Sequence, residues 1–352
     1  MRTVFLICAL LLGFTLGCLF PISRSGEDVG GGEYDNGLIA YQAYRDGDWD
    51  WEIFVVNADG SNQTQLTDNT SDDMFPAWSP DGRRIAFDSK RDGDREIFVM
   101  DADGGNQTQL TFDDDWDAGP AWSPDGGRIA FTSDRDGDRE IFVMDADGSN
   151  QIQLTDNESL DRWPAWSPDG SRIAFVSDRD GDWEIYEMDA DGRNQRRRTY
   201  GSGKENQFAD ETPAWNPDGK CIAYHAKDDN GDCEIYVLKG GHQRELTHNI
   251  IKDIEPKWSP DGLHIIFTSY PNGITWGSEI FLMEADGSML IQLTTNYSNS
   301  CDPAWSPDGR RIAFSSGRTG SRSEIFVMDA DGGNQTQLTT EGGLNPAWCP
   351  VE

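Results

Sequence analysis

The sequence predicts an all-β fold, a seven-bladed β-propeller in which each blade is a sheet of four antiparallel strands. The first observation is a Pro-Ala-Trp-Ser-Pro-Asp-Gly motif, exact or varied, that recurs every 43 to 49 residues, a period typical of propeller blades. The second is that each repeat consists of four short β-like segments without helical periodicity. The third is that the middle segments are apolar on both faces, so neighbouring sheets must cover them. The motif tryptophans are residues 78, 122, 166, 215, 258, 305 and 348.

The repeat at residues 120–155 illustrates the first half of a blade. Strand A covers residues 120–123 and ends at Pro124-Asp125-Gly126, a strong turn signal. Strand B follows at residues 128–133 and is rich in residues that favour β-structure. The motif therefore predicts a hairpin of strands A and B.

The second half of the same repeat contains the other two strands. After an Asp-Gly turn, strand C begins at Glu140 and continues as an apolar run to Met144. Strand D, residues 151–155, alternates polar and apolar residues, as an exposed edge strand does. Strands B and C therefore form the buried middle of each blade.

The two ends of the repeat region indicate how the ring closes. Strands B and C each occur seven times. The first strand B, residues 38–41, has no strand A before it, and the last strand A, residues 345–349, has no strand B after it. These two strands should pair, with the C-terminal strand innermost, and closure removes open sheet edges.

The repeats resemble the WD-repeat-like propeller repeats of the TolB family. The resemblance rests on Pro-Ala-Trp-Ser-Pro-Asp-Gly, Arg-Ile-Ala-Phe, Glu-Ile-Phe-Val-Met-Asp-Ala-Asp-Gly and Gln-Leu-Thr, and it covers residues 38–349. It implies the fold much more specifically than a function. TolB itself carries a separate N-terminal domain and six blades, whereas we expect this sequence to form seven blades without that domain.

The charge of the chain restricts its partners. The formal net charge is −34, which disfavours nucleic acid and anionic lipid, since both attract basic surfaces. An acidic surface suits a soluble protein, a cation-rich setting or a basic partner.

The N-terminus predicts export from the cytoplasm. Residues 1–17 combine Arg2 with a short apolar run and are interpreted as a signal peptide, and residues 18–36 as a flexible linker before a propeller at 37–352. The segment ending in Gly17-Cys18 resembles a lipobox, so Cys18 is a candidate lipid anchor and the expected membrane contact. Ordinary signal cleavage near Cys18 is the alternative. We expect an extracytoplasmic, periplasmic or cell-surface, protein.

Loop lengths predict which face of the disc binds a partner. The A–B and C–D turns share one face, where the strand B isoleucine stands seven positions after the strand A tryptophan in all six measurable copies. The B–C and D–A loops share the other face, and the D–A loops range from 6 to 13 residues. Variable loops on a rigid scaffold often carry function, although neutral variation would look the same.

Aromatic and basic residues gather on these variable loops. Exposed tryptophan and tyrosine are common anchors at interfaces and in sugar sites, and packing against a neighbouring loop is the alternative for each of them. The candidate binding residues are Trp116, Arg162, Trp163, Trp183, Tyr200, Lys204, Trp276 and Tyr297.

The acidic B–C turns raise the question of a metal. Asp134, Asp136, Asp138 and Glu140 alternate along one turn, and calcium prefers six to eight oxygen ligands. Asp-Gly is also the preferred chemistry of a tight hairpin, and we favour that interpretation. No other metal and no cofactor is expected, because no CxxC pair or converging histidine set is evident.

These observations favour a non-catalytic, monomeric propeller that binds an envelope protein, a peptide or a glycan through the B–C/D–A loop face. The alternative is a carbohydrate-active enzyme, because oligogalacturonate lyases with similar repeats hold a histidine-bound metal in the channel. A spacer without a discrete ligand is a third possibility. No catalytic residue is assigned, since a Gly-x-Ser-x-Gly motif is absent from the sequence.

Overall fold

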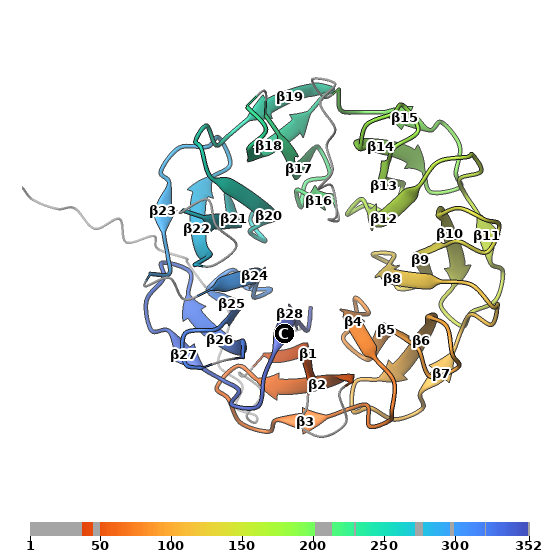
Figure 1. Cartoon of the computed structure of the whole chain (residues 1–352), viewed down its shortest axis with the longest axis horizontal. Helices are drawn as coiled ribbons and strands as arrows, with labels where there is room; N and C mark the ends of the chain where they lie inside the picture. The colour runs from red at the N-terminus through yellow and green to blue at the C-terminus, as the bar shows by residue number, and fades with distance from the viewer. Residues whose placement is uncertain are drawn as a thin grey trace, which may run out of the picture. The chain divides into compact units, whose positions relative to one another are not determined.

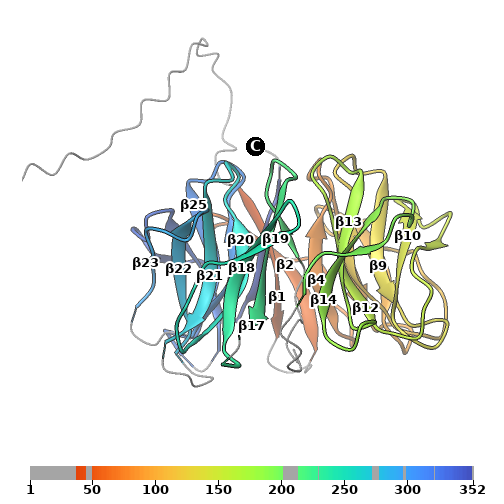
Figure 2. The same ribbon diagram turned by 90° about the horizontal axis from the view of Figure 1, so that it is seen from above.

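The computed structural model describes residues 37–44, 50–200, 213–228, 230–271, 277–295, 299–320 and 322–350. Within these ranges 28 strands form seven four-stranded antiparallel sheets, which confirms the predicted fold and blade number. The sheets are arranged radially around a central axis (Figure 1), and their strands run between the two faces of the disc (Figure 2). No helix that could cross a bilayer occurs in these ranges.

Blade 1 joins the two ends of the propeller, with the order β28-β1-β2-β3, and blades 2 to 7 each use four consecutive strands from β4 to β27. The predicted closure is confirmed, because Ile39 of β1 pairs with Trp348 of β28 and Ala40 pairs with Ala347. A β-sheet edge that would otherwise be open is thereby paired.

Strand A is innermost in every blade. In six blades it begins two to four residues before the motif proline, earlier than predicted, because a β-bulge lets pairing continue through that proline. In blade 5 it begins just after Pro213. The inner strands are β4 (Asp73–Trp78), β8 (Asp117–Trp122), β12 (Asp161–Trp166), β16 (Ala214–Trp215), β20 (Lys252–Trp258), β24 (Ser300–Trp305) and β28 (Leu344–Trp348).

Strands B and C form the middle of each blade, and their apolar runs are almost fully buried. The B strands are β1 (Leu38–Tyr44), β5 (Arg84–Ser89), β9 (Arg128–Ser133), β13 (Arg172–Ser177), β17 (Cys221–Lys227), β21 (His264–Tyr270) and β25 (Arg311–Ser316). The C strands are β2 (Trp51–Asn57), β6 (Glu96–Asp101), β10 (Glu140–Asp145), β14 (Glu184–Asp189), β18 (Cys233–Lys239), β22 (Glu279–Glu284) and β26 (Glu324–Asp329).

Strand D lies at the rim and is shorter than predicted, because only two to four of its residues pair with strand C. The rest of each predicted D segment leads into the D–A loop. The D strands are β3 (Thr64–Gln65), β7 (Thr108–Gln109), β11 (Ile152–Gln153), β15 (Arg196–Arg197), β19 (His242–Glu245), β23 (Ile291–Gln292) and β27 (Thr336–Gln337).

The hydrophobic core lies between adjacent blades. One cluster joins Ile97 and Val99 of blade 2 to Trp122 and Phe131 of blade 3. Phe131 is fully buried, and burial of such a side chain contributes about 1.5–3 kcal/mol. Because each blade supplies half of two cores, the stability of one blade depends on its neighbours.

The motif tryptophan links each blade to the one before it. Its indole Nε1 donates to a backbone carbonyl of the preceding inner strand, as Trp122 does to Ala77 at 3.1 Å. The same bond crosses the closure, where Trp78 donates to Ala347 at 3.0 Å. This interblade bond explains why the tryptophan recurs in every repeat.

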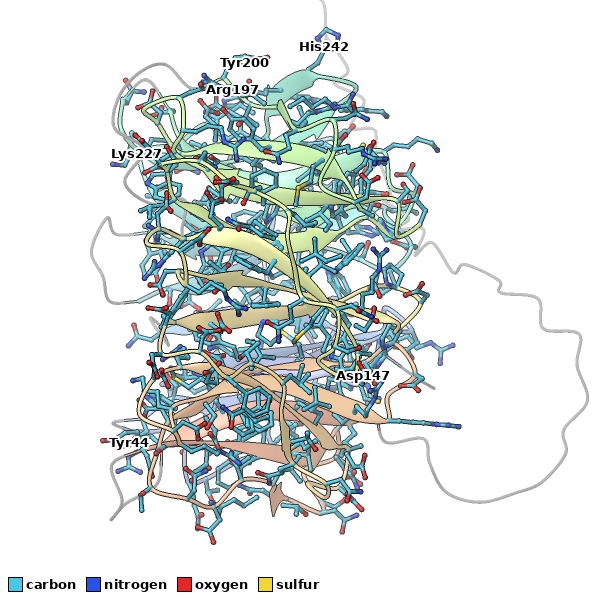
Figure 3. All side chains as sticks on the ribbon, turned by 90° about the vertical axis from the view of Figure 1, so that its right-hand side faces the viewer. Tyr44, Asp147, Arg197, Tyr200, Lys227 and His242 are labelled. Carbon is cyan, nitrogen blue, oxygen red and sulfur yellow. The ribbon has the colours of Figure 1, made fainter. Side chains whose placement is uncertain are left out.

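The two faces of the disc carry different connections, as predicted. Figure 3 places Tyr44 and Lys227, at the ends of two B strands, on one side and Asp147, in a C–D turn, on the other. The B–C/D–A face is therefore physically separate from the A–B/C–D face.

Candidate functional site

The inner strands surround a channel of about 860 Å³ along the propeller axis. Residues of β4, β8, β12, β20, β24 and β28 contribute to its wall. A cavity of this size accommodates a small ligand or a short peptide segment.

One ring of channel residues has an unusual backbone. In each of the six blades where the position is described, the residue before the motif proline lines the channel with a positive φ. We call these residues the pre-proline ring. They are Phe75 (φ 55°), Gly119 (67°), Trp163 (56°), Glu255 (60°), Asp302 (52°) and Asn345 (52°).

A β-bulge produces this conformation. The register between β4 and β5 shifts between Met74 and Ala77, so that Phe75 and Pro76 together occupy one place in the ladder. A bulge redirects a side chain, and here it turns the pre-proline side chain towards the axis. A residue before proline normally adopts an extended backbone, and a left-handed residue other than glycine costs about 1–3 kcal/mol. Such strain is typical of functional sites.

Blades 2 to 4 supply an aromatic arc. The rings of Phe75 and Trp163 meet edge to face, with centroids 6.3 Å apart and planes inclined at 67°. Trp163 lies over Gly119, where a Cβ atom would come within 3.2 Å of the indole. The left-handed glycine therefore makes room for the tryptophan. The indole Nε1 of Trp163 is buried and has no hydrogen-bond partner among the described residues.

Blades 6, 7 and 1 supply a polar, acidic arc. Glu255 Oε2 accepts hydrogen bonds from Thr268 Oγ1 at 2.7 Å and from the backbone N–H of Asp302 at 3.1 Å. Asp302 Oδ2 accepts from Ser315 Oγ at 2.9 Å and from the backbone N–H of Asn345 at 3.4 Å. Burial, together with the neighbouring Glu255 carboxylate, raises the pKa of Asp302 to about 6.

The two arcs come from opposite halves of the disc, as the positions of β4, β8 and β12 against β20, β24 and β28 show in Figure 1. The pre-proline positions of one half present aromatic rings, and those of the other half present carboxylates. Lys257, Trp258 and Trp305 of the acidic half are also in the wall. Such a channel suits a ligand that combines an apolar or aromatic part with a cationic or hydrogen-bond-donating part.

The predicted binding residues separate into three environments. Trp163 lines the channel. Trp116 and Trp183 each pack against a guanidinium, with Arg139 Cζ 4.3 Å from one ring centroid and Arg162 Cζ 4.4 Å from the other. Tyr200 is 65 % exposed and contacts Arg197, near one edge of Figure 3. Of the four predicted aromatic residues that the structure describes, only Trp163 lines the channel.

Four predicted residues lie outside the described ranges. They are Cys18, Lys204, Trp276 and Tyr297. The lipid anchor and the contribution of these loop residues stay predictions.

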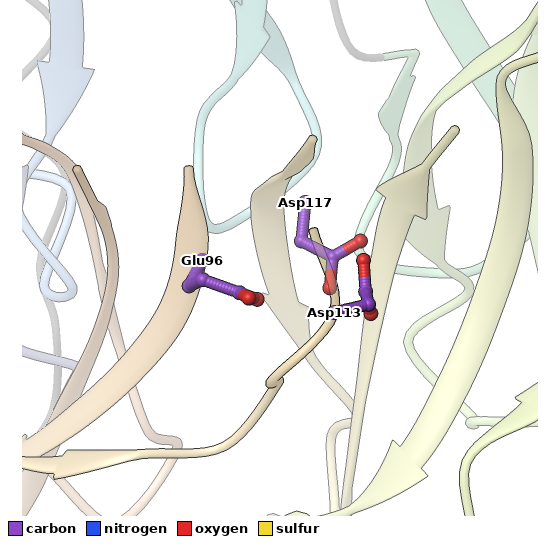
Figure 4. Close-up of side chains that lie close together, drawn as sticks. All are labelled: Glu96, Asp113 and Asp117. Carbon is purple, nitrogen blue, oxygen red and sulfur yellow. The ribbon is translucent and has the colours of Figure 1, made fainter. Parts of the chain in front are cut away.

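The weak calcium candidates of one B–C turn make separate contacts. Asp134 Oδ1 accepts the backbone N–H of Trp116 at 2.7 Å, and Asp136 accepts from Gln153. Asp138 and Glu140 are the other two candidates in that turn. The described residues form two clusters of carboxylates that could hold a metal ion, and none of these four candidates belongs to either cluster. Those clusters, with oxygens within 4.8 Å of one another, are Glu96, Asp113 and Asp117 (the Glu96 cluster, Figure 4) and Asp228, Glu234 and Glu245 (the Glu234 cluster).

Histidines and cysteines do not gather at the channel. No histidine occurs among the described residues that line it. Cys221 pairs with Lys239 and Cys233 with Lys227, so these cysteines are not opposite each other, as predicted, and both are free thiols.

Sequence reasoning missed most of the pre-proline ring. Only Trp163 is among the predicted binding residues, because that prediction rests on aromatic and basic residues in or beside the B–C and D–A loops. A signal was available in the position before each motif proline. The proline and the tryptophan that follow it are the same in all seven repeats. This position, in contrast, carries Phe, Gly, Trp, Thr, Glu, Asp and Asn in turn.

The fold and channel define a closed propeller whose axial wall, unlike its framework, differs from blade to blade. The TolB beta propeller domain model matches residues 114–224 and 275–351, more than half of the chain, and the chain belongs to this family. The Tricorn protease N-terminal beta propeller domain model matches residues 48–136.

Individual relatives agree on the fold. TolB from Acinetobacter baumannii is 22 % identical with a TM-score of 0.57, covering 90 % of this chain and 67 % of its own. Oligogalacturonate lyase from Vibrio parahaemolyticus is 12 % identical with a TM-score of 0.62, covering 87 % and 86 %. Dipeptidyl-peptidase 5 of Porphyromonas gingivalis is 52 % identical over 42 residues, which are 12 % of this chain and 6 % of that enzyme.

Proposed function

We propose that this protein is a non-catalytic binding propeller outside the cytoplasm, which takes a protein or peptide segment with a basic group and an apolar or aromatic group into its channel. The aromatic arc would pack against the apolar part, and Glu255 and Asp302 would pair with the cation. This proposal moves the main contact from the loops of the B–C/D–A face to the channel wall.

The single observation that carries the proposal is the pre-proline ring. The same left-handed bulge occurs in all six blades where this position is described, yet its side chain differs in each. A purely structural bulge would favour glycine or asparagine, which adopt positive φ at low cost. Phe75, Trp163 and Glu255 occupy it instead, so binding is a reason for these side chains to be retained.

The chemistry of the arcs supports a basic ligand over an acidic one. Two carboxylates beside a channel of a chain with net charge −34 repel uronic acids and other anions. The enzyme alternative, a lyase of acidic sugars, lacks this electrostatic support. A neutral glycan stacked on Trp163 is compatible with the aromatic arc and is an outcome of the test below.

The location proposal rests on the signal-like residues 1–17 and on membership of the TolB propeller family. A fusion of these residues to a reporter that is active only after export tests it. Activity that depends on the apolar run supports export, and activity without it contradicts export.

The ligand proposal is tested by titrating the full chain with three defined panels: short peptides that combine arginine or lysine with an aromatic residue, the same peptides with glutamate instead, and neutral or uronic oligosaccharides. We expect binding of the basic peptides that weakens with salt. Glu255→Gln combined with Asp302→Asn should weaken it at least about tenfold, as expected for loss of close charge pairs.

Tyr200→Ala is the matched control, since Tyr200 is exposed and is not part of the channel wall. It should leave binding unchanged. Preferential binding of neutral glycans would show that the ligand is a sugar and not a peptide. Cleavage of uronic oligosaccharides would favour the enzyme alternative. If Tyr200→Ala weakens binding more than the double variant does, the binding site lies on the loops of the B–C/D–A face.

A further inference from the structure

The Glu234 cluster lies in blade 5, away from the channel. Asp228 follows β17, Glu234 is the second residue of β18, and Glu245 is the last residue of β19. Each offers a carboxylate oxygen, and the three oxygens lie within 4.8 Å of one another. The cluster thus joins a B–C loop, a central strand and the rim strand of one blade.

Two of these acids replace a different residue of the repeat. Counted along strand B, Asp228 stands where five of the other blades have arginine, in a B–C loop that is one residue longer than in blades 2 to 4. Glu245 stands where five have glutamine. The arginines are Arg45, Arg91, Arg135, Arg179 and Arg318, and the glutamines are Gln65, Gln109, Gln153, Gln292 and Gln337. The cluster is therefore a departure of one blade from the common pattern, whereas Glu234 recurs in every repeat.

The replaced arginine has a clear role elsewhere. In blade 4, Arg179 stacks on Tyr186 with its Cζ 4.6 Å from the ring centroid and pairs with Asp161 at 2.5 Å. In the Glu96 cluster, Arg135 similarly contacts both Asp113 and Asp117, at 2.9 and 2.7 Å. The Glu234 cluster has no ion pair to lysine or arginine within the described part of the chain. Its negative charge is therefore not balanced by such a side chain.

Glu234 also carries a buried oxygen without a partner. The residue is 0 % exposed, and its Oε1 accepts the backbone N–H of Asn249 at 2.8 Å. Its Oε2 is buried and receives no well-formed hydrogen bond from the described residues, although the Thr247 hydroxyl lies near the Glu234 carboxyl. At the same place in blade 7, Thr339 Oγ1 donates to Glu324 Oε2 at 2.7 Å. A buried carboxylate oxygen left in this way requires a proton or a cation.

We propose that the Glu234 cluster binds a divalent cation that prefers oxygen ligands, specifically Ca²⁺. Calcium–oxygen distances of 2.3–2.6 Å mean that two oxygens bound to one ion lie at most about 4.6–5.2 Å apart, and the three oxygens, all within 4.8 Å of one another, satisfy this limit. His248 Nδ1 lies 2.9 Å from Glu245 Oε1 and orients that carboxylate. Water completes the coordination, since Asp228 and Glu245 are both partly exposed. Bound calcium links the B–C loop of blade 5 to its rim strand.

The test uses the full chain after removal of metal with a chelator. Equilibrium dialysis against Ca²⁺ at constant ionic strength, followed by elemental analysis, should find one tightly held ion per chain. Thermal unfolding should shift upwards with Ca²⁺ and much less with an equal concentration of Mg²⁺. Glu245→Gln should weaken binding at least about tenfold, because it removes one charged ligand.

Glu245→Gln is expected to fold, because glutamine is present at this position in five blades, where for example Gln337 Nε2 donates to Thr339 O at 2.7 Å. The control is Asp113→Asn in the Glu96 cluster, which likewise introduces a residue that other repeats contain, such as Asn69. This variant should bind calcium normally. The proposal is overturned if the parent holds no such ion, if Glu245→Gln binds as the parent does, or if Asp113→Asn abolishes binding.

Discussion

Two positions three residues apart on the same inner strand behave in opposite ways. Trp78 recurs as tryptophan in all seven repeats, and its indole bonds to the preceding blade. Phe75 occupies a position where no two repeats agree, and it faces the channel with a strained backbone. The first position builds the ring, and the second gives the ring an asymmetric interior.

This difference separates scaffold from site inside a single motif. A repeat protein needs identical contacts between neighbouring units, so framework positions are held constant along the chain. A binding site for an asymmetric ligand needs side chains that differ from one repeat to the next. Variation at one position within an otherwise constant motif therefore indicates function more directly than loop length does.

The strongest test of the framework position is Trp78→Ala. The change removes a buried indole at the closure between blades 1 and 2, together with its hydrogen bond to Ala347. We expect the free energy of unfolding to fall by about 3–5 kcal/mol. Chemical denaturation measures it. Trp183→Ala, which removes a half-buried indole stacked with Arg162, is the control and should cost clearly less.

The framework also predicts how stability depends on pH. Burial raises the pKa of Glu52 to about 7 and the pKa of Glu96 and Glu140 to about 8. In the unfolded chain the ordinary value near 4.5 returns, so the unfolded state loses these protons more readily. The resulting stability is full below pH 4.5 and is lost as the pH rises through 7 to 8.

The melting temperature should therefore rise by several degrees when the pH is lowered from 8.5 to 5 at constant ionic strength. Glu96→Gln should reduce this slope, because the amide does not titrate. If Glu96→Gln keeps the full dependence of the melting temperature on pH, general surface charge causes that dependence. A melting temperature that rises with pH would contradict the predicted effect of the buried glutamates.

The smallest expected change in stability is at the site position, with Trp163→Gly. Glycine relieves about 1–3 kcal/mol of left-handed strain, which offsets the loss of a half-buried indole and its contact with Phe75. We expect the free energy of unfolding to stay within about 1 kcal/mol of the parent. Peptide binding in the channel should nevertheless be lost. A variant that unfolds as easily as Trp78→Ala would place Trp163 in the framework instead.

Much of the site was within reach of the sequence, and one part was not. The variable position before each motif proline is visible in the printed chain. Its backbone is not, because the usual preference before proline is extended, and Trp163 and Glu255 adopt the left-handed region instead. The bulge that causes this depends on pairing with strand B, which local preferences do not describe.

The sequence by itself determined the fold class, the seven blades and the pairing of residues 38–41 with 345–349, because strand periodicity and turn chemistry are local and repeat along the chain. Only the tertiary structure decided that Phe75 and Trp163 meet across Gly119, that Glu255 and Asp302 form the opposite wall, and that Asp228 and Glu245 converge on Glu234. The channel residues lie on different blades, so their meeting depends on the radius of the ring. The three acids lie on or beside different strands of one blade, so their meeting depends on strand register, which local sequence preferences do not encode.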